Sequence, residues 1–264
     1  MDPNRVSACT YPLREQSLDV ALGTLARAGF TYVDLWGRAP HFSTIPSRVK
    51  PRDIEKACAA HGVRIANLAT YPGGNLTHRD RAIRHQAMAE MTRTIDLAVR
   101  FGARCVRVMA GGGDDPKLIR ELSRPLRQAA VYAASKGVYL GVENHAGSLA
   151  RDPELALELC KAVDNSHFGI LYDPCNLLHA GVDPKAAFET LKEHIVHIHI
   201  KDGAWVNGEF QLCHLGQGQV DIPWIVAAME GIGYDGYYAL EYEMTEIEPL
   251  ETGLPRWREY LEGL

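Results

Sequence analysis

Four side chains that commonly bind metal ions lie at or near the ends of apolar runs in the second half of the sequence. Glu143 closes YLGVE, Asp173 closes FGILYD, His199 lies in IVHIHI and Glu241 closes YYALE. If these runs are neighbouring strands, three carboxylates converge, and their burial is costly unless a cation neutralises them. Three carboxylates with one imidazole suit a hard or borderline divalent ion better than a structural zinc site, which favours thiolates. The pattern predicts one divalent ion, with Mn²⁺ expected and Mg²⁺, Co²⁺ or Zn²⁺ as alternatives.

Each of these acids has another interpretation when it is taken alone. A single carboxylate at a strand end often caps the next helix or pairs with a surface Lys or Arg. Four candidate ligands in successive runs favour the metal site over that interpretation. Side chains alternate between the two faces of a strand, so His197, His199 and Lys201 share one face. The opposite face is apolar and carries Val196, Ile198 and Ile200. His197 is expected to be a core or supporting histidine rather than a ligand.

Eight short apolar runs alternate with longer amphipathic segments along the whole chain. This order predicts a parallel sheet with helices between its strands, and closure of eight strands into a barrel is the commonest arrangement. A doubly wound open sheet is the alternative, but no G-x-G-x-x-G follows the first run, where a dinucleotide fold carries it. We therefore predict an α/β fold, a single (β/α)₈ TIM barrel that spans 1–264 as one domain. The expected strands are 6–10, 32–36, 64–69, 105–109, 139–143, 168–173, 195–200 and 237–241.

The segments between these strands are predicted to be helices, from the spacing of their apolar residues and from residues typical of helix ends. Two apolar stripes have helical spacing, one formed by Leu18, Leu22 and Leu25 and the other by Met88, Met91, Ile95 and Val99. Proline is tolerated in the first turn of a helix, so helices are expected to open at Pro116, Pro153 and Pro184. The charged stretch 243–256, rich in Pro and Glu, is expected to be a final loop.

Composition and charge restrict the partners. The chain has 264 residues, of which 46% are hydrophobic, and a formal net charge of −5. A large core is therefore expected, without general attraction to nucleic acid or to an anionic membrane. No run has the length of a membrane span, and the N-terminal residues lack the apolar core of a signal peptide. Six scattered cysteines without a Cys-x-x-Cys pair indicate reduced thiols, so a cytoplasmic protein is expected, with a homo-oligomer left open.

Five short motifs carry a resemblance to a known group of enzymes. They are G-V-E-N-H (141–145), Y-D-P-x-N (172–176), H-I-H-I-K-D (197–202), L-G-x-G-x-V-D (215–221) and L-E-Y-E (240–243). With them the chain, over essentially its whole length, resembles the xylose-isomerase-like superfamily, which includes ketose 3-epimerases, hydroxypyruvate isomerase, inosose dehydratase and the endonuclease IV repair enzymes. The resemblance to the ketose 3-epimerases implies one Mn²⁺ or Co²⁺ held by Glu143, Asp173, His199 and Glu241. It also implies that Glu143 and Glu241 are the acid–base pair.

The sequence departs from these relatives at specific places. Where ketose 3-epimerases have Asp-x-x-His after the sixth strand, this chain has Asn176 in place of the histidine. The arginine that those enzymes carry shortly after the strand-seven histidine is also absent, and Lys201 or Trp205 occupies the region. Both differences argue against simple ketose 3-epimerisation. The repair endonucleases are less similar still, because their zinc site needs histidines after early strands, and 67–71 and 109–113 contain none.

Two further segments are candidates for binding substrate. Trp36, at the end of the second run, is expected either to stack on a sugar face or to be a buried aromatic. Gly111–Asp115 offers backbone N–H groups to a phosphate, but its two aspartates disfavour a bound anion. An ordinary turn is therefore predicted for this segment.

The residues and the resemblance together predict a metal-dependent isomerase or epimerase that works through an enediolate on a ketose or a related carbonyl sugar. Glu143 and Glu241 would move the protons, while His145, Asn176 and Lys201 would orient hydroxyls or steady the oxyanion. A lyase or dehydratase on a keto-sugar, keto-inositol or keto-glycoside is the alternative, because it forms the same enolate and then expels a leaving group. A non-catalytic sugar-binding subunit is a third possibility, which the intact pair of glutamates disfavours.

Overall fold

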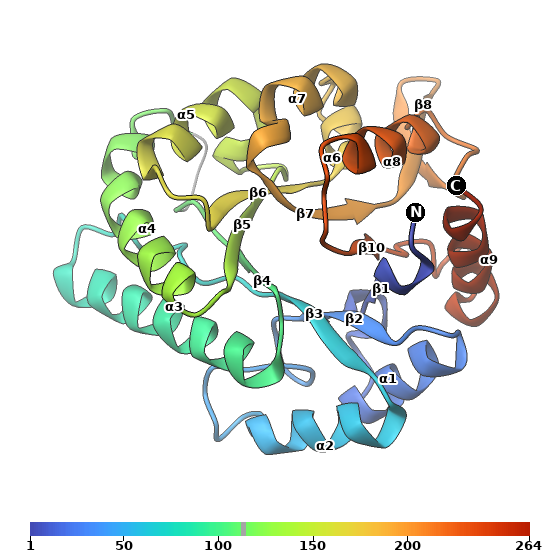
Figure 1. Ribbon diagram of the computed structural model, residues 1–264, viewed down its shortest axis with the longest axis horizontal. Coiled ribbons are helices and arrows are strands. Elements are labelled where there is room, and N and C mark those ends of the chain that lie inside the picture. The colour runs from blue at the N-terminus through green and yellow to red at the C-terminus, as the bar shows by residue number, and fades with distance from the viewer. Residues whose placement is uncertain (112–114) are drawn as a thin grey trace.

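The fold is a barrel of parallel strands surrounded by helices (Figure 1). The computed structural model describes residues 1–111 and 115–264, so the turn predicted at Gly111–Asp115 lies largely outside the described residues. Within the described residues, eight strands close in the order β1-β10-β7-β6-β5-β4-β3-β2. They are β1 Val6–Cys9, β2 Tyr32–Trp36, β3 Arg64–Ala69, β4 Cys105–Val108, β5 Tyr139–Glu143, β6 Phe168–Tyr172, β7 Ile195–Ile200 and β10 Tyr238–Leu240. The predicted (β/α)₈ barrel is confirmed, and the open sheet is excluded.

Helices lie between successive strands and form the outer ring (Figure 1). They are α1 Leu18–Arg27, α2 Pro51–His61, α3 Arg81–Phe101, α4 Leu118–Ser135, α5 Pro153–Val163, α6 Pro174–His179, α7 Pro184–Leu191, α8 Ile222–Gly231 and α9 Leu250–Glu262. Pro153 and Pro184 open helices as predicted, whereas α4 begins two residues after Pro116. No helix among the described residues is long and apolar enough to cross a membrane.

Two expectations about the outer ring were wrong in part. The stretch 243–256 is not wholly a loop, because α9 begins at Leu250, where leucines and Trp257 recur at helical spacing and are buried. In α3, Val99 belongs to the predicted stripe but is 44% exposed. It lies at the edge of the stripe, whose centre is formed by Met91, Ile95 and Ala98.

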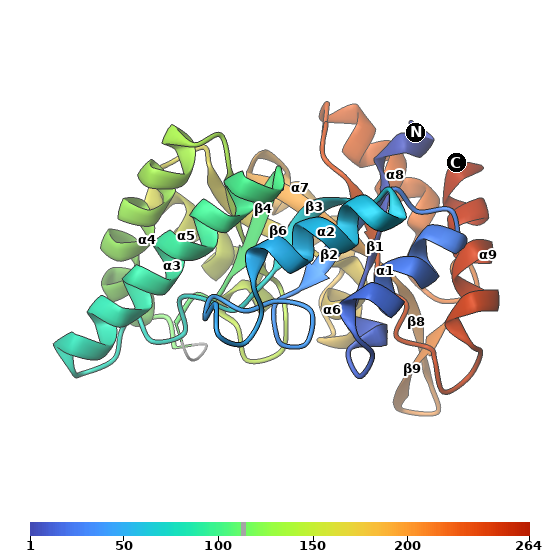
Figure 2. The ribbon, with the colours of Figure 1, turned by 90° about the horizontal axis from the view of Figure 1, so that it is seen from below.

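A two-stranded hairpin interrupts the alternation of strands and helices after β7. Strands β8 (Asp202–Val206) and β9 (Glu209–Cys213) pair antiparallel and project beyond the barrel (Figure 2). The buried Asp202 carboxylate anchors the base of the hairpin by accepting backbone hydrogen bonds of 2.8 to 3.1 Å from Gly203, Gly216, Gly218 and Val220. The hairpin is thereby held beside the C-terminal ends of the strands.

Candidate metal centre

The four predicted metal ligands converge at the C-terminal ends of four adjacent strands. Glu143 ends β5, Asp173 follows β6, His199 lies in β7 and Glu241 follows β10. Each offers one ligand atom, and these atoms all lie within 4.8 Å of one another. All four residues are buried. The barrel therefore gathers side chains that are almost one hundred residues apart in the sequence.

Asp173 is positioned by the end of the neighbouring strand. Asn144 donates its side-chain amide to the Asp173 carbonyl at 2.6 Å, and its carbonyl oxygen accepts from the Asp173 backbone N–H at 2.8 Å. One carboxylate oxygen, Oδ1, accepts from the backbone N–H of Asn176 at 2.9 Å and so caps α6. The helix-cap interpretation is thus correct for this acid, but it occupies only one of the two oxygens.

Two cations lie against the carboxylates. Arg107 Nη2, from β4, is 2.6 Å from Glu143 Oε2. Lys201 Nζ is 2.6 Å from Glu241 Oε2 and 3.2 Å from Asp173 Oδ2. Each cation compensates part of the negative charge that the barrel buries.

The three carboxylates differ in pKa because their neighbours differ. Burial raises the pKa of each, but the charges around Glu143, Arg107 first, outweigh burial and lower its pKa to about 2. At Glu241 burial is again outweighed, chiefly by Lys201, and the pKa is well below its ordinary value. At Asp173 burial and the two glutamates outweigh Lys201, so the pKa rises to about 6. Both glutamates are therefore ionised at neutral pH.

The donor set fits a divalent cation. Glu143 Oε2 and Asp173 Oδ2 are buried oxygens that accept no hydrogen bond, although a cation lies near each. His199 Nδ1 faces the same space, at 3.1 Å from Glu143 Oε1 and 3.6 Å from Glu241 Oε2. Carboxylate oxygens with one imidazole are ligands that Mn²⁺ or Mg²⁺ accepts.

Three members of the cluster, Glu143, His199 and Glu241, line a cavity of about 690 Å³, a size suited to a small organic ligand. All four predicted substrate residues line this cavity: Trp36, His145, Asn176 and Lys201. The Asn176 side-chain amide nitrogen is buried without a hydrogen-bond partner. Trp36 is half-buried and donates its ring N–H to the Tyr71 hydroxyl at 3.1 Å. Their roles towards a substrate remain predictions.

Two charged residues of the site were missed by the sequence analysis. Arg107 in CVRV and Asp34 in YVDLW both come from early strands that carry no recognised motif. A charged residue inside an otherwise apolar run could have identified both Arg107 and Asp34. Because side chains alternate along a strand, such a residue can point into the barrel interior or the cavity. His197, expected in the core, is buried with Nε2 2.6 Å from Asp34 Oδ2.

The chain belongs to the xylose isomerase-like TIM barrel family, which matches residues 22–263. This match confirms the resemblance stated for the sequence motifs. The family assignment rests on nearly the whole of the barrel.

The chain is similar to 3-dehydroshikimate dehydratase of Pseudomonas putida, with 25% identity over 239 residues, 85% of this chain and 36% of that enzyme. It thus spans about a third of that enzyme, and about half or less of the other curated relatives first matched. A xylose isomerase-like TIM barrel protein from Mycobacterium smegmatis, solved in complex with magnesium, superposes with a TM-score of 0.81 at 18% identity, over 97% of this chain and 95% of that one. A D-tagatose 3-epimerase-like protein has a TM-score of 0.76 at 18% identity, with 98% of both chains covered. At these identities the superpositions show the fold alone.

Proposed function

We propose that this protein is a divalent-metal-dependent enzyme that removes the proton beside a carbonyl group of a small polyhydroxylated substrate. The observation that carries the proposal is the buried group of Glu143, Asp173, His199 and Glu241, three of which (Glu143, His199 and Glu241) line the cavity. These four residues would hold the ion, with Mn²⁺ as the expected metal. When bound, the ion supplies Lewis-acid polarisation of the carbonyl and stabilises the enolate charge.

Glu143 and Glu241 are the proposed acid–base pair. A carboxylate accepts a proton only when it is ionised, and nearby cations keep both glutamates in that form. Glu143 lies at the end of β5 and Glu241 follows β10, and the two strands β6 and β7 lie between them. Two bases that come from different strands and line one cavity suit removal of a proton from one face and its return to another face or carbon. His145, Asn176 and Trp36, which line the same cavity, are proposed to orient the substrate.

The primary proposal for the product is an isomer or epimer of a ketose or related carbonyl sugar. A second candidate is elimination, in which the same enolate expels water or another β-leaving group. The similarity to a 3-dehydroshikimate dehydratase favours this second candidate. Both reactions need the same first proton transfer, so both depend on the same two glutamates.

A panel of ketoses, keto-inositols and keto-glycosides incubated with the Mn²⁺-loaded protein in deuterated water tests the proposal. An isomer or epimer is expected to carry solvent deuterium at the carbon that receives the returned proton, as measured by NMR. Mass spectrometry then separates the candidates, because an isomer keeps the skeleton and a dehydrated product loses water. Substrates that bind but show neither deuterium exchange nor conversion to an isomer or a dehydrated product would instead indicate a non-catalytic binding subunit.

A further inference from the structure

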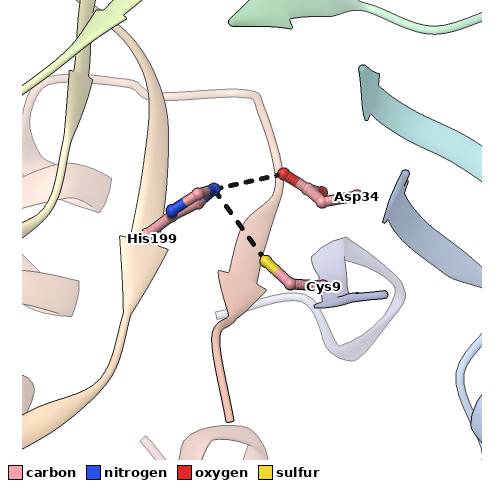
Figure 3. A group of neighbouring side chains, drawn as sticks. All are labelled: Cys9, Asp34 and His199. Carbon is pink, nitrogen blue, oxygen red and sulfur yellow. Dashed lines mark hydrogen bonds and ion pairs between the residues drawn. The ribbon is translucent and has the colours of Figure 1, made fainter. Parts of the chain in front are cut away.

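The two ring nitrogens of His199 face different groups. Nδ1 faces Glu143 and Glu241, within the proposed metal centre. Nε2 faces the other way, 3.5 Å from Asp34 Oδ2 and 3.9 Å from Cys9 Sγ (Figure 3). His199, Asp34 and Cys9 are all buried. The surroundings of Nε2 therefore decide which nitrogen is left for the metal.

Asp34 is held rigidly behind His199 by residues from three other strands. Its Oδ1 accepts from the Ser7 hydroxyl at 2.9 Å, and its Oδ2 accepts from the Asn67 amide at 2.8 Å. His197 Nε2 is 2.6 Å from the same Oδ2. These three contacts hold the Asp34 carboxylate in a fixed orientation, with Oδ2 toward His199.

Cys9 is the weaker of the two possible partners for Nε2. Its Sγ lies 3.9 Å from Nε2, whereas Asp34 Oδ2 lies 3.5 Å away. A thiol is a weak hydrogen-bond acceptor, whereas a hydrogen bond to a carboxylate is charge-assisted. A proton on Nε2 is therefore stabilised mainly by Asp34.

We propose that Asp34 is a positioning residue that accepts the Nε2 proton of His199 and thereby directs Nδ1 to the metal. The proposal rests on the metal centre proposed above. A carboxylate behind a metal-binding histidine fixes the tautomer and orientation of the ring and increases its basicity as a ligand. Asp34 lies in β2, a strand that carries none of the four proposed metal ligands. Its role therefore cannot be recognised from the ligands alone.

The test compares Asp34→Asn with Cys9→Ala, which alters the other neighbour of Nε2. Each protein is first freed of metal with a chelator and then titrated with Mn²⁺ in a calorimeter. Asp34→Asn is expected to bind Mn²⁺ roughly 10- to 100-fold more weakly than wild type, the usual effect of losing such a partner. Cys9→Ala is expected to bind as wild type does. In Mg²⁺-loaded wild-type protein with ¹⁵N-labelled histidine, NMR should show His199 protonated at Nε2. The Asp34→Asn protein should lose that preference.

The outcomes separate this inference from the metal centre itself. Wild-type protein that binds no divalent ion contradicts the metal centre. Metal-binding wild-type protein whose His199 is protonated at Nδ1 overturns the role of Asp34, and this readout does not depend on the folding of any variant. Unchanged affinity and tautomer in Asp34→Asn, with only a lower melting temperature, also overturn it. So does a Cys9-dependent sulfur-to-metal absorption band in Co²⁺-loaded protein, because Nε2 would then be a ligand beside the thiolate.

Discussion

Lys201 Nζ lies 2.6 Å from Glu241 Oε2, so an ammonium group sits among the carboxylates proposed to bind a metal. Its side chain is only 6% exposed, and Glu243 Oε2 is also within 2.9 Å. Although burial disfavours the charge of Lys201, the surrounding carboxylates, Asp173 first, hold its pKa well above the ordinary value. The lysine therefore carries a positive charge that would share the neutralisation of these carboxylates with the proposed ion.

Lys201→Met is expected to make folding depend strongly on the metal. Removing one partner of a buried ion pair costs about 3–5 kcal/mol, because the other charge is left uncompensated. In chelator, the free energy of unfolding should fall by an amount of this order. Saturating Mn²⁺ should restore much of it, since the ion replaces the missing charge. Urea denaturation with chelator and with Mn²⁺ measures both effects.

Lys185→Met is the matched control. Lys185 Nζ is also 2.6 Å from a carboxylate, that of Asp221, but both side chains are more than 40% exposed. An exposed pair contributes about 1 kcal/mol or less, and the contribution does not depend on a metal. Equal losses in the two variants, with no difference between chelator and Mn²⁺, would show that Lys201 does not share the site with an ion.

The purified protein is expected to contain about one divalent ion per chain, removable by chelator. His199→Ala should lose most of the metal, because the ligand set loses its imidazole. His145→Ala, which changes another histidine of the same cavity, should keep it. Elemental analysis after gel filtration measures the content. Equal metal in wild type and in a variant with Glu143, Asp173, His199 and Glu241 all changed to alanine contradicts the proposed centre.

The barrel and the four clustered residues were predictable because both depend on local patterns. Each buried strand is a short apolar run, and in a parallel barrel the C-terminal ends of all strands meet at one face. Residues such as Glu143 and Glu241 therefore come together once the strand count is right. The expected strand ends agree with the structure to within about one residue.

Arg107, Asp34 and the hairpin were not predictable in the same way. The partner of Arg107 is known only when β4 and β5 are placed side by side, since the pairing with Glu143 joins residues 36 positions apart. The hairpin depends on the anchoring of Asp202 by backbone N–H groups up to 18 residues away. Such contacts depend on the chain path and leave no periodic signal in the sequence.

Asp202→Ala is expected to loosen the hairpin. Its buried carboxylate accepts four backbone hydrogen bonds, and each buried N–H left without an acceptor costs about 1–3 kcal/mol unless water reaches it. The variant should be destabilised, and protease should cleave within 202–221 before the barrel unfolds. Limited proteolysis with mass spectrometry locates the cut. Asp183→Ala, which removes an exposed helix-cap contact to Lys185, is the control and should leave the hairpin protected. Resistance equal to wild type in Asp202→Ala contradicts the anchoring role.

Glu143→Gln and Glu241→Gln are expected to separate metal binding from proton transfer. Glutamine keeps an oxygen ligand and nearly the same shape, but it cannot accept the substrate proton. Each variant should retain much of its Mn²⁺, while turnover falls roughly 10²-fold or more, the scale of losing general acid–base catalysis. Calorimetry and steady-state kinetics measure the two properties separately. Glu246→Gln, a substitution of an exposed glutamate in the loop after Glu241, should alter neither.

The two glutamine variants are also expected to differ from each other if the protein uses two bases. Each retains one base, so each is expected to lose exchange at one face of the substrate and to keep slow deuterium exchange at the other, without completing the reaction. Following the deuterated position by NMR in each variant assigns the faces to Glu143 and Glu241. If both variants turn over at near wild-type rates with metal bound, the acid–base assignment is wrong. The glutamates would then serve only as ligands, and His145 or Lys201, which line the same cavity, would become the candidates for the base.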